Sequence, residues 1–257
     1  MKIFNDIELI DLAIYTNRTL IFTDFHIGYE EALNKQGLMV PRFQFKEIMA
    51  RLEKIFLKLK GRNARTESGT NSVGIEKIVV NGDLKHEFGT ISEQEWRNTL
   101  MLLDYFGQHC EEIVLIRGNH DAILGPIARK RNVKVLRHYL ISPIIKKESK
   151  NKILVIHGNE IPDEKILEGV STIIIGHEHP AVSVREGARS ELFKAFLAGK
   201  WKEYNIIVQP SFNLVVEGTD ALKEEALSPF LKGNLGKFEA IIAGDKLYRF
   251  GKLRNFG

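Results

Sequence analysis

The feature that most constrains the fold of this chain is a set of short apolar runs, each of which stops at glycine or at polar side chains. Residues 77–80 end in Asn81-Gly82-Asp83, and residues 112–116 end in Arg117-Gly118-Asn119-His120-Asp121. Similar runs occupy residues 19–22, 153–156 and 172–175. Short apolar runs bounded by turn-forming residues are typical of buried β-strands. The sequence therefore predicts a sheet in which several strands present polar side chains at their ends.

Helical patterns separate these predicted strands. After Pro41, apolar residues recur at helical spacing, at Phe45, Ile48, Met49, Leu52, Ile55, Phe56 and Leu59. Ser92 followed by Glu95 is a capping box that predicts a second helix, ending near Gln108. Alternation of strands and helices predicts an α/β fold.

The rest of the chain extends this pattern without dividing it. We expect a strand at residues 12–15 paired with 19–22, further strands at 192–197, 204–208, 239–242 and 247–250, and a short helix at 221–227 that stops before Pro229. Residues 61–74 contain almost no apolar side chain, which predicts a mobile surface loop. With no internal repeat and no linker, we expect one domain over residues 1–257, in which residues 180–257 supply closing strands and the short helix.

Composition excludes several classes of protein. The single cysteine, Cys110, excludes a disulfide framework within the chain and a cysteine-based zinc site. No apolar stretch approaches the roughly 20 residues needed to cross a membrane, and the first residues do not resemble a signal peptide, so a cytoplasmic protein is expected. Residues 1–128 have a net charge of −3 and residues 129–257 of +7. This asymmetry has two interpretations, an anionic partner such as nucleic acid or a solvated surface without a partner.

The polar residues at the predicted strand ends share one property, the ability to bind metal ions. They are Asp24, His26, Asp83, Asn119, His157, His177 and His179. Because ligands of open α/β sheets bind beyond the carboxyl ends of the strands, we expect these side chains to converge. Residues i and i+2 of an extended chain point to the same side, which would bring Asp24 to His26 and His177 to His179. Oxygen and imidazole donors suit Mn²⁺, Fe²⁺, Ni²⁺ or Zn²⁺, and seven ligands suit two ions.

In chain order, these motifs resemble the five motifs of the calcineurin-like metallophosphoesterase superfamily. They are Asp24-x-His26, Gly82-Asp83, Gly118-Asn119-His120-Asp121, His157-Gly158 and Gly176-His177-x-His179, which span residues 24–179. The resemblance implies a four-layer αββα sandwich, in which helices flank two mixed β-sheets. It also implies two divalent metal ions, with manganese expected and iron, nickel, zinc or magnesium as alternatives.

The resemblance assigns a role to each motif residue. Asp24, His26 and His179 would bind one metal ion, Asn119, His157 and His177 would bind the other, and Asp83 would bridge them. A hydroxide held between the ions would attack phosphorus, and His120 would stabilise the transition state and protonate the leaving oxygen. Asp121 could orient His120, but we expect it instead to cap a helix that begins there.

The second motif departs from the Ser/Thr phosphatases of this family, which have Asp-Arg-Gly where this chain has Asp83-Leu84-Lys85. His86, three residues after Asp83, is similar to the double-strand-break repair nuclease branch and related phosphodiesterases, so His86 could assist His120 or be an ordinary loop residue. The chain as a whole resembles archaeal phosphoesterases related to that nuclease. Only 78 residues follow His179, too few for a large DNA-capping domain, which argues against processive cleavage of long DNA.

Two basic features have alternative interpretations. Arg117 could contact a substrate phosphate or pair with an acid at the sheet edge. Residues 129–152 hold nine Lys and Arg with one acid, and could either follow a phosphate backbone or form two exposed strands with solvated lysines. Aromatic residues do not alternate with these charges, which favours the exposed strands.

Three functions therefore remain as hypotheses. The first is a phosphoesterase that hydrolyses a phosphodiester, including one derived from a nucleotide. The second is a manganese-dependent nuclease or a nuclease subunit that acts on nucleic acid, and the third is a scaffold that keeps the fold without catalysis. The sequence does not specify the substrate, the native metal or the oligomeric state.

Overall fold

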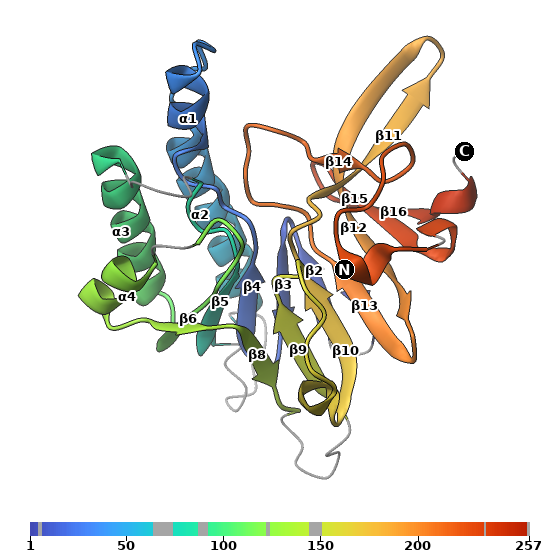
Figure 1. Ribbon diagram of the computed structural model, residues 1–257, viewed down its shortest axis with the longest axis horizontal. Helices are drawn as coiled ribbons and strands as arrows, with labels where there is room; N and C mark the ends of the chain where they lie inside the picture. The colour runs from blue at the N-terminus through green and yellow to red at the C-terminus, as the bar shows by residue number, and fades with distance from the viewer. Residues whose placement is uncertain are drawn as a thin grey trace.

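Two mixed β-sheets pack face to face at the centre of the molecule (Figure 1). The computed structural model describes residues 1–4, 7–63, 74–86, 92–121, 124–143, 151–233 and 235–255. The first sheet has the order β1-β2-β3-β4-β5-β6-β7, in which β4 to β7 are parallel and β1 to β4 antiparallel. Its strands are β1 Lys2–Ile3, β2 Ile7–Ile10, β3 Ala13–Thr16, β4 Thr19–Phe22, β5 Lys77–Asn81, β6 Glu112–Ile116 and β7 Lys134–Leu136.

The second sheet has the order β14-β11-β12-β13-β10-β9-β8, and β15 and β16 extend it from β12. Within it, β9, β10 and β13 are parallel. Its strands are β8 His138–Ile141, β9 Lys152–Ile156, β10 Val170–Ile175, β11 Pro180–Glu186, β12 Arg189–Trp201, β13 Tyr204–Val208, β14 Thr219–Asp220, β15 Glu239–Ala243 and β16 Leu247–Lys252.

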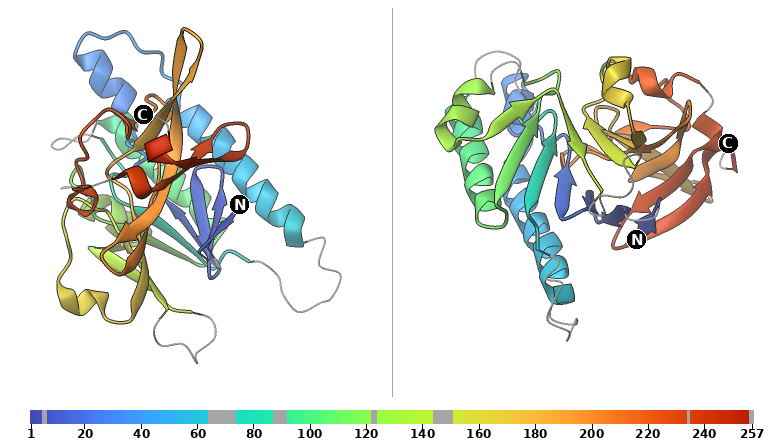
Figure 2. Two further views of the ribbon diagram at one scale, coloured as in Figure 1. Left: turned by 90° about the vertical axis from the view of Figure 1, so that its right-hand side faces the viewer. Right: turned by 90° about the horizontal axis from the view of Figure 1, so that it is seen from below.

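Helical segments form the two outer layers. The α-helices α1 Tyr29–Lys35, α2 Gln44–Asn63, α3 Glu93–Gly107 and α4 Gly125–Arg131 lie beside the first sheet, as the two turned views also show (Figure 2). The 3-10 helices η1 Glu164–Leu167, η2 Pro229–Leu231, η3 Leu235–Lys237 and η4 Leu253–Asn255 contribute apolar residues to the core of the second sheet. The expected four layers are present, with 3-10 helices and loops as the fourth. No helix of the described residues is long and apolar enough to span a membrane.

Successive residues of the central strands belong to different cores. In β5, Ile78 and Val80 face the α-helices, whereas Val79 faces the second sheet. In β10, Ile174 faces the first sheet, whereas Ile173 faces away from it, into the core that the 3-10 helices cover. A strand that is buried on both faces has no polar face, which explains the uninterrupted apolar runs of the sequence.

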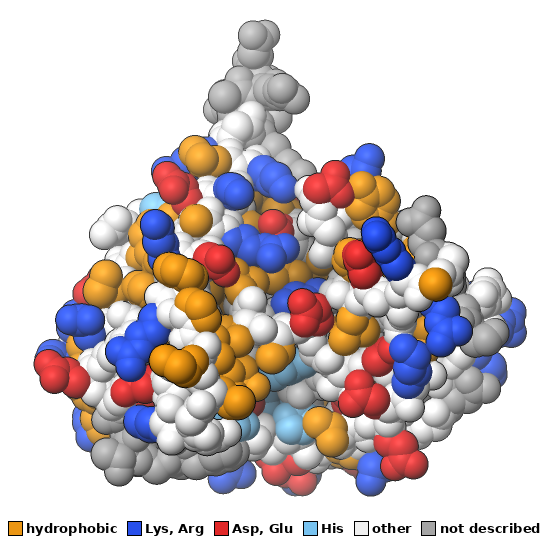
Figure 3. Space-filling view, turned by 90° about the horizontal axis from the view of Figure 1, so that it is seen from above, with side chains coloured by type: hydrophobic (Ala, Val, Ile, Leu, Met, Phe, Trp, Pro, Cys, Tyr) orange, Lys and Arg blue, Asp and Glu red, His pale blue; other side chains and the backbone are white. Residues whose placement is uncertain are grey.

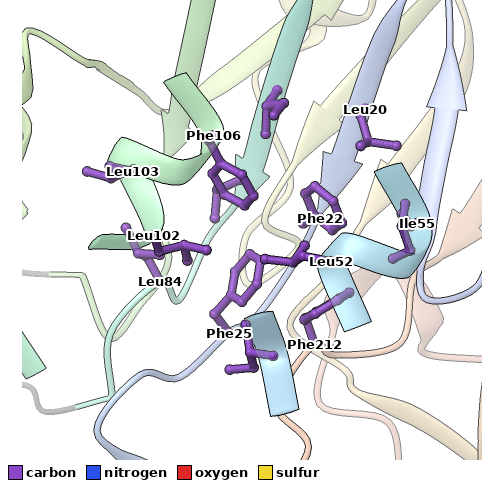
Figure 4. Packing of buried hydrophobic residues seen from close by; sticks show 14 of the residues in the cluster. Leu20, Phe22, Phe25, Leu52, Ile55, Leu84, Leu102, Leu103, Phe106 and Phe212 are labelled. Atoms are coloured by element: carbon purple, nitrogen blue, oxygen red, sulfur yellow. The ribbon is translucent and has the colours of Figure 1, made fainter. Parts of the chain in front are cut away.

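An aromatic cluster anchors the loops that follow β4 and β13. Phe25 packs against Phe212 with ring centroids 4.9 Å apart, and Phe22 stacks on Phe106 at 5.4 Å (Figure 4). All four rings are buried. Phe25 lies between Asp24 and His26 in the sequence, so its burial turns those two polar neighbours away from the core.

Two buried amides tie the sheets together at this end. Gln209 Nε2, after β13, donates to the carbonyls of Leu12 (2.8 Å) and Ile21 (3.0 Å) in the first sheet. Asn81 Nδ2, at the end of β5, donates to the carbonyl of Ile156 at the end of β9, at 3.0 Å. These bonds hold the strand ends of the two sheets in register.

Two predictions about local structure were wrong, and one helix was not predicted. Residues 221–227 form a single turn, in which the N–H groups of Lys223 and Glu224 both donate to the Asp220 carbonyl. The Asp220 carboxylate also accepts from the Leu222 N–H, and this competition with the backbone explains why no helix continues. Residues 61–63 belong to α2, while residues 64–73 of the predicted loop lie outside the described residues. Helix α1 was not predicted.

The basic segment 129–152 does contain two short strands, β7 and β8, as its second interpretation expected. Residues 144–150, which hold three of its nine basic side chains, lie outside the described residues.

Candidate metal centre

The predicted ligands follow β4, β5, β6, β9 and β10, whose carboxyl ends meet at one edge of the sandwich. Viewed onto this edge, histidine side chains gather in a recess between the two halves of the molecule (Figure 3). The recess therefore draws its side chains from both sheets.

One group consists of Asp24, His26 and His179. One donor atom from each lies within 4.8 Å of the others. His26 Nε2 is 3.2 Å from His179 Nε2, and His179 Nε2 is 3.6 Å from Asp24 Oδ2. This is the set that the resemblance assigned to one metal ion.

A second group consists of Asp83, His157 and His177, whose donor atoms also lie within 4.8 Å of one another. Asn119 joins it, with Oδ1 2.9 Å from His157 Nε2. Asp83 Oδ2 lies 3.4 Å from His157 Nε2 and 3.7 Å from His26 Nε2 of the first group. Asp83 thus stands between the two groups, where a bridging carboxylate would have to be.

The backbone that brings the ligand pairs together is left-handed rather than extended. Asp24 (φ 52°), His26 (φ 45°), His177 (φ 63°) and His179 (φ 48°) all have positive φ, as does Asp83 (φ 44°). Asp24 and His26 share one ligand group as expected, and His177 and His179 lie one in each group, but the reason given from strand geometry was wrong. Strands β4 and β10 have already ended at Phe22 and Ile175. Such strain is uncommon outside glycine and gathers at functional sites.

Two glycines let the motif loops approach one another. A Cβ on Gly118 would lie 2.1 Å from Asp83 Oδ1, and a Cβ on Gly82 would lie 2.0 Å from His157 Nδ1. Any side chain at either position would therefore push apart two motifs that come from different strands.

Burial and neighbouring charges set the ionisation of the cluster. Burial opposes ionisation of Asp24, but His179, His157 and His26 outweigh it and hold the Asp24 pKa well below its usual value. The pKa of Asp83 is also lowered, because His157 overcomes the effect of burial. Burial alone would lower the pKa of His157, yet its contacts with Asp83 and Asp24 raise it to about 9.

Two other histidines are held neutral. Burial, reinforced by His179, lowers the pKa of His26 to about 3. Burial, reinforced by His157, lowers the pKa of His177 to about 4. Neutral imidazoles beside ionised carboxylates are the protonation states in which these groups bind metal ions.

The donor set fits divalent metal ions, and one atom in particular requires a partner. Asp24 is fully buried, and its Oδ1 has no hydrogen-bond partner among the described residues, with His157 Nδ1 as a charged neighbour at 3.6 Å when that ring is protonated. A buried carboxylate oxygen without a partner is costly, whereas a metal ion would satisfy it. Two carboxylates, four imidazoles and an amide oxygen suit first-row divalent ions.

His120 and His86 lie beside the first group. His120 N donates to Asp83 Oδ1 at 2.8 Å, and His120 Nδ1 donates to the His86 carbonyl at 2.7 Å. The rings of His86 and His120 stack 5.3 Å apart, and His86 Nδ1 is 3.3 Å from His26 Nδ1. Both histidines therefore have a ring nitrogen close to a candidate ligand.

Asp121 is not a helix cap, which corrects our expectation. Helix α4 begins at Gly125 after Leu124, whereas Asp121 is fully buried and its Oδ2 accepts from the Gly118 N–H at 3.0 Å. Burial, reinforced by the charge of Asp83, raises its pKa to about 7. The Asp121 carboxylate therefore binds within its own turn. The next helix starts at Gly125, later than the apolar pattern indicated.

The side chain of Arg117 is exposed, and its backbone N–H donates to the carbonyl of Leu136. Among the described residues, no side-chain hydrogen bond or ion pair joins Arg117 to the cluster. A role in substrate binding stays a prediction.

Three residues beside the cluster were missed from the sequence. The ring of Tyr29 lies edge-on to His86 with centroids 4.5 Å apart. The Glu178 carboxylate accepts from the N–H groups of Leu227 and Ser228, at 2.9 Å each, and so ties that segment to the His177–His179 loop. Lys85 Nζ donates to the carbonyl of His120 at 2.8 Å. Glu178 stood within a recognised motif and Lys85 directly after one, but lysines and glutamates are rarely buried, so no sequence signal marked them.

Solved structures of other proteins are similar to this chain to different degrees. Among solved structures, a nuclease MPE from Pseudomonas putida has a TM-score of 0.60 at 18% identity, over 93% of this chain and 92% of that chain. A protein of unknown function from Aquifex aeolicus has a TM-score of 0.34 at 15% identity, over 63% and 78%. Vacuolar protein sorting 29 from Cryptosporidium parvum has a TM-score of 0.36 at 14% identity, over 91% and 97%.

No curated protein matches the chain. The family model for calcineurin-like phosphoesterases matches residues 17–216, which include every predicted ligand and most of both sheets. The chain therefore belongs to the calcineurin-like phosphoesterase family.

Proposed function

We propose that this protein is a cytoplasmic phosphoesterase that hydrolyses phosphodiester bonds with two divalent metal ions. Manganese is the metal that we expect. The observation that carries the proposal is the position of Asp83 between the two ligand groups, within 3.4 Å of His157 and 3.7 Å of His26. Asp24, His26 and His179 would hold one ion, and Asn119, His157 and His177 the other. Bound there, the ions would neutralise charge on the phosphoryl oxygens and lower the pKa of a water nucleophile.

Residues of the chain supply the ionised carboxylates and the proton for the leaving group. Asp83 and Asp24 stay ionised because the surrounding histidines lower their pKa values. His120 Nδ1 donates to the His86 carbonyl, and in a protonated imidazole the second nitrogen, Nε2, is also a donor. We assign His120 Nε2 the transfer of a proton to the leaving oxygen, with His86 beside it.

The preference for diesters rests on the second motif. The family's Ser/Thr phosphatases, which act on monoesters, have Asp-Arg-Gly in the second motif, and this chain has Leu84 and Lys85 in place of Arg-Gly. Both side chains are buried, and the ammonium of Lys85 is bound to the His120 carbonyl. Neither can therefore supply a second positive charge to a dianionic monoester.

Hydrolysis of two chromogenic esters tests the proposal. Metal-loaded protein should cleave bis(4-nitrophenyl) phosphate faster than 4-nitrophenyl phosphate, and Asp83→Asn should lower kcat at least about 100-fold, since removal of one charge-stabilising group costs about that much. The exposed Lys165→Met serves as the control and should not change kcat. A strict monoesterase would contradict the diester preference, and a protein that neither binds metal nor hydrolyses either ester would be a scaffold.

Cleavage of nucleic acid is the second candidate. It is favoured by the net charge of +7 in residues 129–257 and by the fold shared with a nuclease. With Mn²⁺, we would then expect cleavage of single-stranded or hairpin DNA that weakens as salt increases. Absence of such cleavage, while bis(4-nitrophenyl) phosphate is hydrolysed, would leave a phosphodiesterase of small substrates.

A further inference from the structure

We propose that Lys85 is a positioning residue whose buried ammonium holds His120 in place for proton transfer. The inference rests on the proposed function, since it assigns His120 to the leaving group. Lys85 is 0% exposed and is one of the largest fully buried side chains of the described residues. Its Nζ donates to the His120 carbonyl at 2.8 Å.

Three hydrogen bonds join His120 to residues 83–86. Its N–H donates to Asp83 Oδ1 at 2.8 Å, its Nδ1 donates to the His86 carbonyl at 2.7 Å, and its carbonyl accepts from Lys85 Nζ. Both backbone groups and one ring nitrogen of His120 are therefore bound to one neighbouring loop. We assign the other ring nitrogen, Nε2, to the leaving group.

Lys85 is well placed to fix the distance between the two loops. The backbone N–H of Lys85 is 3.5 Å from Asp121 Oδ1, and Asp121 Oδ2 accepts from the Gly118 N–H. The turn 118–121 is thus closed from inside by Asp121 and held from the opposite loop by Lys85. Backbone bonds from His26 to Asp83 and from Ile27 to Leu84 in turn fix residues 83–86 to the loop after β4.

Energetics also favour a positioning role. Removing an ammonium from water is unfavourable unless new partners replace its hydration, whereas a methionine of similar length would fill the same space without that penalty. A lysine at this position therefore stabilises a particular loop arrangement rather than the core as such. The bond to a backbone carbonyl restrains His120 without competing for its ring.

Proton transfer from His120 predicts that the effect of this restraint on the rate depends on the leaving group. A water molecule that has lost one proton to solvent forms the new bond to phosphorus. As the bond between phosphorus and the ester oxygen breaks, the proton on His120 Nε2 moves to that oxygen. A phenolate leaving group needs this proton far more than a 4-nitrophenolate does. Misplacing His120 should therefore slow poor leaving groups selectively.

The central experiment compares Lys85→Met with the wild type on diphenyl phosphate and bis(4-nitrophenyl) phosphate, both with Mn²⁺. We expect kcat on diphenyl phosphate to fall about 100-fold and kcat on the nitrophenyl ester to fall less than about 5-fold, with KM unchanged, because general acid catalysis contributes about that much. Lys85→Arg, which retains a donor, should recover part of the loss. Lys165→Met, at an exposed lysine, is the matched control.

A double-mutant cycle separates positioning from general damage. In the His120→Gln background, Lys85→Met should lower kcat on diphenyl phosphate by less than about 3-fold, because the group that Lys85 positions is already lost. Additive losses would overturn the proposal. Equal losses on both esters, or weaker Mn²⁺ binding measured by calorimetry, would show that Lys85 supports the ligand set instead.

A readout without turnover keeps this test apart from the proposed function. In the metal-free protein, ¹⁵N-imidazole NMR should show a fixed Nδ1–H on His120 that is lost in Lys85→Met. If the wild type hydrolyses no ester but this signal behaves as expected, the proposed function fails while the structural restraint stands. An unchanged signal overturns the inference, and if Lys85→Met does not fold, Lys85→Gln, whose shorter amide cannot reach the carbonyl, gives the same comparison.

Discussion

Single residues at the centre hold unfavourable states that bound metal ions would relieve. Asp24 combines a left-handed backbone with a buried oxygen that has no hydrogen-bond partner among the described residues. Each residue in such a backbone conformation costs about 1–3 kcal/mol. His157 is different, because without metal it stabilises the cluster as a cation between Asp24 and Asp83, with a pKa of about 9.

This protonated state predicts that metal binding releases a proton. His157 must be neutral to bind a metal ion, and below pH 9 it carries a proton in the metal-free protein. Affinity for Mn²⁺ should therefore rise about tenfold for each pH unit up to about pH 9. Calorimetry at pH 7 in two buffers with different ionisation enthalpies should show release of about one proton, because His26 and His177 are already neutral.

The stability of the metal-free protein should also depend on the protonation of His157. Its stability should fall as pH rises, whereas the affinity for Mn²⁺ should increase. A histidine whose folded pKa lies above the unfolded value of 6.5 stabilises the fold below pH 6.5, and this contribution disappears as pH rises through 9. His157→Gln should remove both this dependence and the proton release. Release of three protons at pH 7 would contradict the assignment.

At the scale of elements, the start of helix α3 supports the site as well as the helix. Ser92 Oγ accepts from the Glu95 N–H at 3.1 Å, and Glu95 Oε2 accepts from the Ser92 N–H at 3.4 Å, which confirms the predicted capping box. The other carboxylate oxygen of Glu95 accepts from the His86 N–H at 3.0 Å. One glutamate therefore joins a helix terminus to the loop that carries His86.

Substitutions at the two ends of this capping box should have different effects. Ser92→Ala should lower the free energy of unfolding by about 1 kcal/mol and leave kcat nearly unchanged, whereas Ser92→Thr should preserve stability. Glu95→Ala should lower stability to a similar degree and also lower kcat, because it releases the His86 backbone. Urea unfolding and steady-state kinetics measure the two effects, and equal kcat losses in Ser92→Ala and Glu95→Ala would argue against a link between helix and site.

At the scale of the whole molecule, the candidate ligands join the two sheets. Asp24, His26, Asp83 and Asn119 follow strands of the first sheet, whereas His157, His177 and His179 follow strands of the second. Away from this edge, the sheets are held by the apolar core between them and by buried amides such as Gln209. Metal ions would add a bond between the sheets that only the folded chain can make.

Mn²⁺ should therefore raise the melting temperature. At a concentration 100 times its Kd, a ligand that binds only the folded state adds about 2.7 kcal/mol of stability. For a domain of this size, that corresponds to a rise of roughly 5–11 °C. Differential scanning calorimetry with Mn²⁺ and with EDTA measures the rise, which should be much smaller in Asp83→Asn and unchanged in Lys165→Met. An equal rise in Asp83→Asn would argue against a bridging position.

Much of the fold could be predicted because strand and helix signals are local. The strands at 204–208 and 112–116 have the predicted bounds, since a strand buried on both faces needs only an apolar run with turn residues at its ends. The helix prediction failed where a side chain accepts a hydrogen bond from a backbone N–H, as Asp220 does in the turn at 221–224. Helix α1 was missed because it is only seven residues long, and no side-chain cap marks its start.

The sequence by itself determined which chemical groups this protein presents and at which strand ends, because the order of apolar runs and polar motifs is a local property of the chain. Only the tertiary structure decided that Asp83 lies between the two ligand groups, that the ligand pairs converge through left-handed backbone, and that Lys85 is buried against His120. The physical reason is that these relations depend on contacts between loops from different strands. Such contacts exist only after both sheets have packed and their strand ends have met.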